Sequence, residues 1–352
     1  MTQALRILAL LLLSAMPAAA ERPAAAAPDA AALLDPARVP YLSEQGRADY
    51  ARFLLQPTPR VFALSPNGAW GWAAAIEDDA EATEMRALEN CRRWAGQECE
   101  VHVRDLTLVD GSYSPPPVPR APLAGEGPWQ LNADRRFIWH GPERARGVYV
   151  WAHGRSPGGA DSRGSQPQPH ARAFNNAGYD IIRLDRDPRL DETEAGAAWM
   201  RKALAELRAR GYRRVVAAGQ SRGAWNALQA LDQPGLADAV IAIAPAAHGP
   251  TGSPAHAWAL DDLRRIVARA SAPGARVAIA NFQGDPFDPD PTQRAAIFRS
   301  FTGRVGALMV LDRPAGIEGH GGGNDWRFTT RYAECLLDFA EGRTRSCDGT
   351  AR

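Results

Sequence analysis

The stretch VVAAGQSRGAWNAL, residues 215–228, changes from an apolar run into an alanine-rich segment around a serine that lies between two glycines. The apolar run predicts a buried strand, and the segment from Arg222 onward predicts a helix. Gly219 and Gly223 would relieve the crowding where a strand turns sharply into a helix. The pattern G-x-S-x-G between a strand and a helix predicts that the Ser221 hydroxyl is presented as a nucleophile at the helix N-terminus.

Segments typical of strands and helices alternate from about residue 130 onward. The predicted strands include GVYVWAHG (147–154), YDIIRLD (179–185), ADAVIAIAP (237–245), ARVAIANF (275–282) and ALMVLD (307–312). Near-continuous apolar strands separated by helices are typical of a mostly parallel sheet that is covered on both faces. The sequence therefore predicts a doubly wound α/β domain over residues 130–352.

Composition and charge indicate a folded protein and argue against a nucleic-acid binder. The chain has 352 residues, of which 45% are hydrophobic and 23% are charged, so it can form a sizeable core. It contains 41 Lys and Arg residues against 40 Asp and Glu residues. A protein that binds nucleic acid is expected to show a basic excess, which this balance lacks.

The first 20 residues are typical of a signal peptide. Arg6 precedes the apolar run ILALLLLSAM, which is followed by small residues before Glu21. The alternative is an uncleaved membrane anchor, but the run is shorter than the ~20 apolar residues that a spanning helix needs. We therefore expect cleavage near Glu21 and a periplasmic or secreted protein with no membrane span after cleavage.

The residues between the signal and the α/β domain divide by composition into three parts. An Ala- and Pro-rich stretch over 21–39 predicts a flexible leader, and residues 40–110 predict a small α+β accessory module. The Pro- and Gly-rich stretch over 111–129 predicts a linker.

Four cysteines form two pairs that are close in sequence. In an exported protein an even number of cysteines indicates disulfides. The pairing Cys91–Cys99 with Cys335–Cys347 is expected because each bond closes a short loop; four free thiols are the alternative. No zinc site is expected, because the chain lacks a C-x-x-C motif.

A base and an acid that could activate Ser221 follow it in the chain. NFQGDPFDPD, residues 281–290, places Asp285 and Asp288 after a predicted strand. GIEGHGGGNDW, residues 316–326, places His320 in a glycine-rich loop after the last strand. A serine hydroxyl is a weak nucleophile until a base accepts its proton, and an acid orients that base. Asp285, which directly follows Gly284, is the preferred acid, and Asp288 remains the alternative.

Two backbone N–H groups are candidates for an oxyanion hole. The N–H of Arg222 directly follows the nucleophile, and the N–H of Arg155 lies in VWAHGRSPGG (150–159), a loop after an early strand. His153 in the same loop is interpreted as a structural residue rather than a base.

Together the motifs HGRSPGG, GQSRG, GDPFD and EGHGGG resemble those of the α/β-hydrolase superfamily, within its dienelactone-hydrolase-like esterases and prolyl-oligopeptidase-like peptidases. The resemblance covers residues 130–342. It implies that Ser221 is the nucleophile, His320 the general base and then acid, and Asp285 its partner. It also implies acyl transfer through an acyl-enzyme, with no metal or organic cofactor.

Three functions are compatible with these residues. The leading hypothesis is an exported serine hydrolase that cleaves a small-molecule carboxylic ester. The second is a peptidase or amidase with the same triad, acting on a peptide. The third is a cell-envelope binding protein that keeps the fold without turnover. The substrate and the oligomeric state are not predicted by the sequence.

Overall fold

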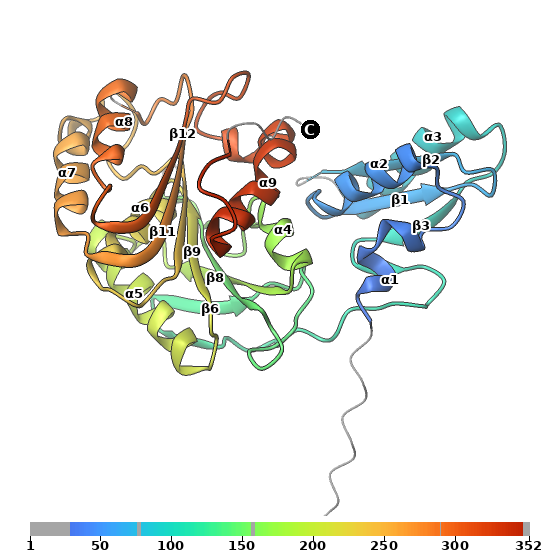
Figure 1. The fold of residues 1–352 in the computed structure, drawn as a ribbon, viewed down its shortest axis with the longest axis horizontal. Helices are drawn as coiled ribbons and strands as arrows, with labels where there is room; N and C mark the ends of the chain where they lie inside the picture. The colour runs from blue at the N-terminus through green and yellow to red at the C-terminus, as the bar shows by residue number, and fades with distance from the viewer. Residues whose placement is uncertain (1–28, 76–78, 156–158, 289, 348–352) are drawn as a thin grey trace, which may run out of the picture.

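The computed structural model describes residues 29–75, 79–155, 159–288 and 290–347. These residues form a large α/β domain and a small α+β module (Figure 1). The predicted signal peptide, residues 1–20, lies outside the described residues. Within the described ranges, no helix is both long and apolar enough to cross a bilayer.

The large domain is built on an eight-stranded sheet with the strand order β12-β11-β10-β9-β7-β8-β6-β5. Its strands are β5 (Ala124–Glu126), β6 (Trp129–Ala133), β7 (Gly147–Ala152), β8 (Tyr179–Arg186), β9 (Val215–Gln220), β10 (Ala239–Ile243), β11 (Ala272–Asn281) and β12 (Val305–Asp312). The strands from β7 to β12 pair in parallel, whereas β6 pairs antiparallel with β8 and β5 antiparallel with β6. The prediction of a mostly parallel, doubly wound sheet is confirmed.

Helices cover both faces of this sheet. One face carries α4 (Ala171–Asn176) and α9 (Trp326–Glu341), and the other carries α5 (Thr193–Ala209), α6 (Arg222–Gln229), α7 (Ala259–Arg269) and α8 (Pro291–Arg299). From β7 the chain moves to β8 on one side of it in the sheet, and from β8 it returns across β7 to β9 on the other side. Right-handed connections in these two opposite directions place α4 and α5 on opposite faces. Ligand sites in such sheets form at the carboxyl ends of the strands beside this reversal, here β7 and β9.

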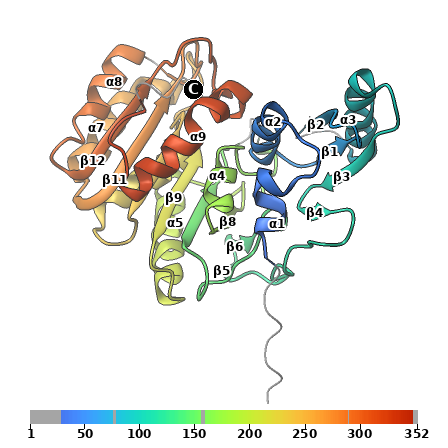
Figure 2. The same cartoon turned by 45° about the vertical axis from the view of Figure 1, so that its right-hand side comes forward.

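The module contains a four-stranded antiparallel sheet between two helices. Its elements are α2 (Glu44–Leu54), β1 (Arg60–Leu64), β2 (Trp70–Ala74), α3 (Ala80–Ala95), β3 (Glu100–Arg104) and β4 (Thr107–Leu108), with the strand order β2-β1-β3-β4. Tyr50 and Phe53 of α2 pack on Phe62 on one face, and Ala87 of α3 packs on the other. Figures 1 and 2 both show the module beside α4 and α9.

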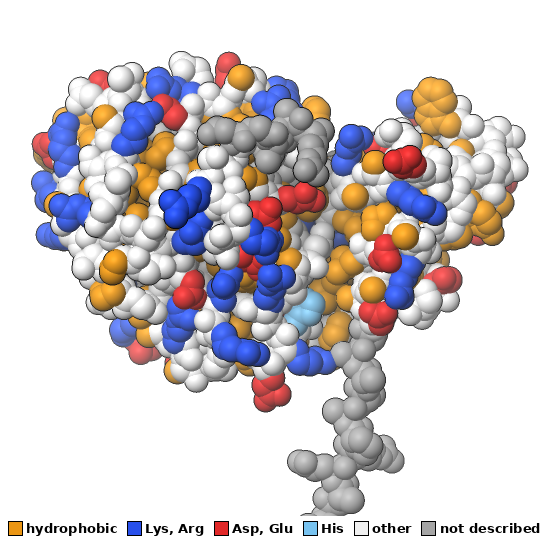
Figure 3. Space-filling view, in the orientation of Figure 1, with side chains coloured by type: hydrophobic (Ala, Val, Ile, Leu, Met, Phe, Trp, Pro, Cys, Tyr) orange, Lys and Arg blue, Asp and Glu red, His pale blue; other side chains and the backbone are white. Residues whose placement is uncertain are grey.

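Two disulfides have the pairing that the sequence predicts. Cys91–Cys99 joins α3 to the start of β3, and Cys335–Cys347 joins α9 to the segment after it. Side chains of both charge signs are distributed over the face shown in Figure 3, as the nearly balanced composition leads one to expect.

The prediction of a flexible leader over 21–39 is wrong for residues 31–38. They form α1 (Ala31–Leu34) and η1 (Pro36–Arg38), and the main-chain oxygen of Leu33 accepts a hydrogen bond of 2.8 Å from the Tyr50 hydroxyl. Leu33 and Val39 are buried in the module core and Leu34 is partly buried against it, which outweighs the Ala- and Pro-rich composition of the stretch.

The predicted linker over 111–129 is also too long. Its last part, β5 with the first residue of β6, forms a hairpin at the edge of the large sheet, in register from Ala124 opposite Leu131. An edge strand of three residues has little burial pattern, so its glycine-rich sequence resembles that of a loop.

We expect Gly223→Ala to destabilise the protein because α6 packs directly on β7. A Cβ atom at Gly223 would overlap the Ala152 carbonyl oxygen, so the helix must move away from the strand. The free energy of unfolding in denaturant should fall by at least ~2 kcal/mol. Gly274→Ala is the control, because a Cβ atom at that position would have open space on every side to 4 Å. Equal stability of the two variants would contradict this packing argument.

Candidate active site

Ser221 sits in a strained turn between β9 and α6. Its φ of 56° and ψ of −119° are values that a non-glycine residue rarely adopts. Its N–H donates to the Ile243 carbonyl at 3.0 Å, and its carbonyl accepts from the N–H groups of Trp225 at 3.0 Å and Ala246 at 3.2 Å. These bonds to β10, α6 and the loop after β10 hold the turn in place.

Asp285 and His320 are brought together by two paired loops. Gln283, after β11, forms a parallel bridge with Glu318, after β12, and the Gly319 N–H donates to the Gln283 carbonyl at 2.8 Å. His320 Nδ1 lies 2.9 Å and 3.0 Å from the two carboxylate oxygens of Asp285. The carboxylate side chain is buried and the imidazole is partly exposed, so the acid can orient a base that remains accessible.

Two neighbouring residues, Gln220 and Phe287, connect His320 with the part of the structure around Ser221. The Gln220 side-chain amide donates to the His320 carbonyl at 3.3 Å. The Phe287 ring packs on the imidazole with a centroid distance of 4.2 Å, and its N–H donates to Asp285 at 2.8 Å. Phe287 also lines a cavity of about 410 Å³ together with Ser221. Among the described residues there is no hydrogen bond between the Ser221 hydroxyl and the imidazole.

Both candidate oxyanion residues line this cavity. Arg222 is the first residue of α6, where N–H groups have no acceptor within the helix. Arg155 lies after β7, the neighbour of β9, and its side chain is exposed. The cavity thus adjoins a helix N-terminus, which favours developing negative charge.

The Arg222 side chain points away from solvent and serves the structure of the site. Its guanidinium donates to the Asp191 carbonyl at 3.0 Å and to the Ala247 carbonyl at 2.9 Å. It therefore connects the loop after β8 to the loop after β10, beneath the Ser221 turn. Burial lowers the pKa of this guanidinium.

His153 is a fixed, neutral part of the loop that carries Arg155. Its Nε2 accepts from the Arg186 N–H at 3.1 Å, so its Nδ1 carries the proton and donates to the Gly154 carbonyl at 2.6 Å. The buried Arg186 guanidinium also donates to the His153 carbonyl at 2.6 Å and pairs with Asp191 at 3.0 Å. Burial and the Arg186 charge lower the pKa of His153 to about 4.

Asp288, the alternative acid, does not contact His320. Its buried carboxylate lies 3.8 Å from the guanidinium of Arg294, which is also buried. Burial raises the pKa of Asp288 and lowers that of Arg294. The structure therefore places Asp285 with the histidine and Asp288 with an arginine of α8.

The loop after β10 supplies the wall of the cavity. Ala246, Ala247, Gly249, Pro250 and Ala255 give it a mainly apolar lining. His248 also lines it, with its ring against Trp225 and its Nε2 bound to the Asp262 carboxylate. Thr251 donates through its N–H to the Pro286 carbonyl at 2.7 Å, which joins this loop to the one that carries Asp285.

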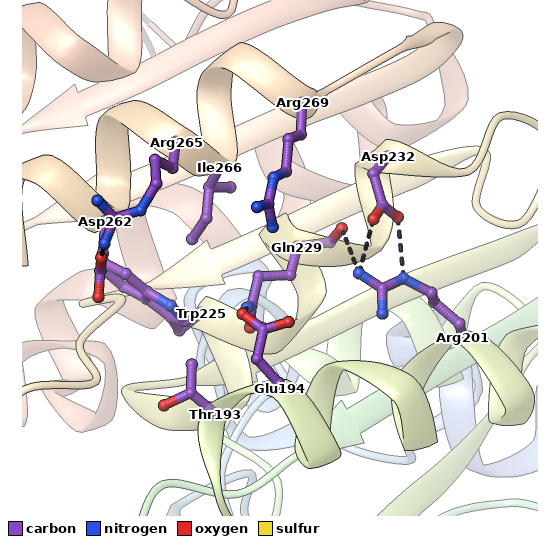
Figure 4. Close-up of a pocket in the computed structure, with 10 residues that line it drawn as sticks. All are labelled: Thr193, Glu194, Arg201, Trp225, Gln229, Asp232, Asp262, Arg265, Ile266 and Arg269. Atoms are coloured by element: carbon purple, nitrogen blue, oxygen red, sulfur yellow. Dashed lines mark hydrogen bonds and ion pairs between the residues drawn. The ribbon is translucent and has the colours of Figure 1, made fainter.

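A second cavity, of about 280 Å³, lies behind Trp225 between α5, α6 and α7 (Figure 4). Arg201 pairs there with Asp232 at 2.7 Å, and Gln229 donates to Glu194 at 3.1 Å. None of its lining residues is a serine, cysteine or histidine. Within the described ranges, no three His, Cys, Asp or Glu side chains are grouped as metal ligands. Ser221, in contrast, lines the cavity of about 410 Å³ that Phe287 shares.

Three residues of the site were not found from the sequence. Phe287 lies two positions after Asp285, but nothing in the sequence shows that its ring contacts His320. Arg186 and Asp191 are separated by five positions. Exposed ion pairs in the loops of α/β proteins often have the same spacing, so the sequence does not show that this pair is buried. Their complete burial depends on contacts with His153, which lies in a different loop.

No protein-family model matches the chain, and no curated protein matches it in sequence. Among solved structures it resembles a puromycin-hydrolyzing peptidase of Mycobacterium tuberculosis, with 15% identity and a TM-score of 0.47 over 82% of this chain. That match covers 47% of the peptidase, so the chain spans about half of its length. A Pyrococcus furiosus esterase gives 13% identity and a TM-score of 0.37 over 60% of this chain and 87% of the esterase.

A puromycin hydrolase gives 20% identity and a TM-score of 0.42, over 61% of this chain and 36% of the hydrolase. All three TM-scores are below 0.5. The description of the fold therefore depends on the strand order and connections of this chain alone.

We expect the buried neutral state of His153 to make stability depend on pH. Its imidazole takes up a proton at about pH 4 when folded and at about pH 6.5 when unfolded, so protonation favours unfolding below about pH 6.5. The free energy of unfolding should therefore fall as the pH decreases from about 6.5 to about 4, by up to ~3 kcal/mol from this residue.

Denaturant titrations at several pH values measure this dependence. His153→Gln cannot titrate and should reduce the decrease without abolishing it. Burial also lowers the pKa of His170 to about 3 and of His248 to about 4, so these residues contribute in the same direction. An unchanged pH dependence in His153→Gln would contradict the assignment.

Proposed function

We propose that the protein is a serine hydrolase that cleaves a carboxylic ester through an acyl-enzyme on Ser221. The observation that carries this proposal is the hydrogen-bonded pair of His320 and Asp285 beside a strained serine turn. Phe287 contacts the imidazole and lines the cavity that contains Ser221, which supports a shared site for base and nucleophile.

In the first half of the reaction, His320 Nε2 accepts the proton of the Ser221 hydroxyl as the oxygen attacks the ester carbonyl. The Asp285 carboxylate accepts the Nδ1–H bond and stabilises the imidazolium. The N–H groups of Arg222 and Arg155 donate to the oxyanion of the tetrahedral intermediate. Collapse of this intermediate breaks the C–O bond, and His320 returns the proton to the leaving alcohol.

In the second half, water attacks the acyl-enzyme and His320 accepts its proton. The acid is released and the proton returns to Ser221. The Ser221–His320 hydrogen bond that this mechanism needs is often long in the absence of substrate and tightens when substrate binds. The exported location is part of the proposal: two disulfides in short loops are typical of an oxidising compartment.

We expect a fluorophosphonate probe to label the protein at one residue, Ser221, because only an activated serine attacks it. Mass spectrometry of the labelled peptide locates the adduct, and Ser221→Ala is the matched control. A panel of aryl esters and aminoacyl amides then distinguishes an esterase from an amidase. Failure of the folded protein to label would favour the alternative of a non-catalytic binding protein.

We expect Asp285→Asn and Asp288→Asn to differ strongly in turnover. Loss of the carboxylate that orients His320 should lower kcat by roughly 10³–10⁴-fold, whereas Asp288→Asn should lower it by less than about tenfold. Steady-state kinetics on a shared aryl ester measures both, with circular dichroism to verify folding. A larger decrease of kcat in Asp288→Asn than in Asp285→Asn would mean that Asp288 is the acid of the triad.

A further inference from the structure

The junction between the module and the large domain contains a large groove. A cavity of about 970 Å³ lies where the proline-rich segment 115–119 passes the large domain at Phe137. An adjoining cavity of about 560 Å³ shares Pro115, Arg135 and Arg136 with it and reaches the module at Thr58. Ligand sites form preferentially at such junctions between domains.

All charged side chains that line the larger cavity are arginines: Arg120, Arg135, Arg136 and Arg183. Two of them are fixed in place by buried carboxylates. Arg136 Nε donates to Asp134 at 2.8 Å, and Arg183 donates to Asp134 at 2.9 Å and to Asp185 at 3.1 Å. These two positive charges are therefore compensated, and they form a rigid wall.

The other two arginines of this wall are not compensated. Arg120 and Arg135 are exposed, and neither forms a hydrogen bond or ion pair with any described residue. A guanidinium offers a planar set of donors that fits a carboxylate or a phosphate through two parallel hydrogen bonds. The larger cavity thus presents two free donor sets and no acidic side chain, whereas Asp105 lines the adjoining cavity.

A second observation at the same junction is an excess of buried positive charge. Arg172 is 1% exposed; its guanidinium stacks on the Phe137 ring at 4.1 Å and donates to the Arg136 carbonyl at 2.5 Å, so it lies directly behind the groove wall. Its Nε and one terminal nitrogen have no acceptor among the described residues, nor has one terminal nitrogen of the buried Arg60.

Burial lowers the pKa of Arg172 well below its usual value; the Arg60 charge acts in the same direction, and the Asp134 and Asp105 charges oppose it only in part. Buried guanidinium N–H groups that lack an acceptor are unfavourable unless an anion or water is near them. An anion in the groove would lower the electrostatic cost of the charges behind its wall.

We propose that this groove binds an organic anion with two or more carboxylate or phosphate groups, with Arg120 and Arg135 as its direct ligands. Arg120 belongs to the segment that leaves the module and Arg135 belongs to the large domain, so the bound anion joins the two. The site is separate from the proposed catalytic centre, because none of the four arginines lines the cavity with Ser221.

Isothermal titration calorimetry on the full chain at low ionic strength tests this site, with citrate as the carboxylate probe and pyrophosphate as the phosphate probe. We expect saturable binding of at least one probe at one site per chain. The double variant Arg120→Ala/Arg135→Ala should weaken the Kd by roughly 100-fold, about tenfold for each charge-assisted contact.

The matched control is Arg264→Ala/Arg299→Ala, which removes two exposed arginines that pair with Asp261 and Asp312. It changes the net charge by the same amount, and its Kd should stay within about threefold of the wild-type value. Binding of citrate alone or of pyrophosphate alone identifies the preferred group. The proposal is overturned if neither probe binds saturably, if the first variant keeps the wild-type Kd, or if the control loses as much.

Discussion

The close approach of α6 to β7 is the constraint on which the candidate site depends. The helix begins so near the Ala152 carbonyl that position 223 has no room for a side chain, and a Cβ at Gly219 would meet the same Ala152 oxygen and the backbone of Gly223 and Ala224. The residue that connects β9 to α6 at this short distance, Ser221, has a positive φ. The backbone strain, of order 1–3 kcal/mol, is offset by hydrogen bonds to β10 and α6.

Buried arginines hold the loops around this turn. The guanidinium of Arg186 joins the His153 and Asp191 loops, and that of Arg222 joins the Asp191 and Ala247 loops. Because Arg186 and Asp191 are both excluded from solvent, removal of either would leave an unpaired buried charge. Loops that lie far apart in the sequence thus form one connected frame around a small cavity.

Long apolar strands and the order of the motifs made the fold predictable, because parallel strands buried on both faces leave a strong pattern in sequence. At α1 and β5 the sequence predicted a flexible leader and a linker instead of a helix and a strand. Only a few residues of these Ala-, Pro- or Gly-rich segments are buried, so the sequence pattern there is weak. At the site, Ser221, Asp285 and His320 were named from motifs, with Asp285 preferred as the acid, but the sequence left Asp288 as an alternative because both lie in one loop. That choice depends on the bridge between Gln283 and Glu318, a contact between distant segments.

If Ser221, His320 and Asp285 act together on one carbonyl carbon, a covalent phosphonate inhibitor should bind in place of the tetrahedral intermediate. A crystal structure of that adduct should show a bond from Ser221 Oγ to phosphorus, a phosphonyl oxygen about 3 Å from the backbone nitrogens of Arg222 and Arg155, and His320 Nε2 within hydrogen-bond reach of Oγ. A phosphonyl oxygen turned to solvent, with the imidazole still out of reach, would mean that the three residues do not form one catalytic group.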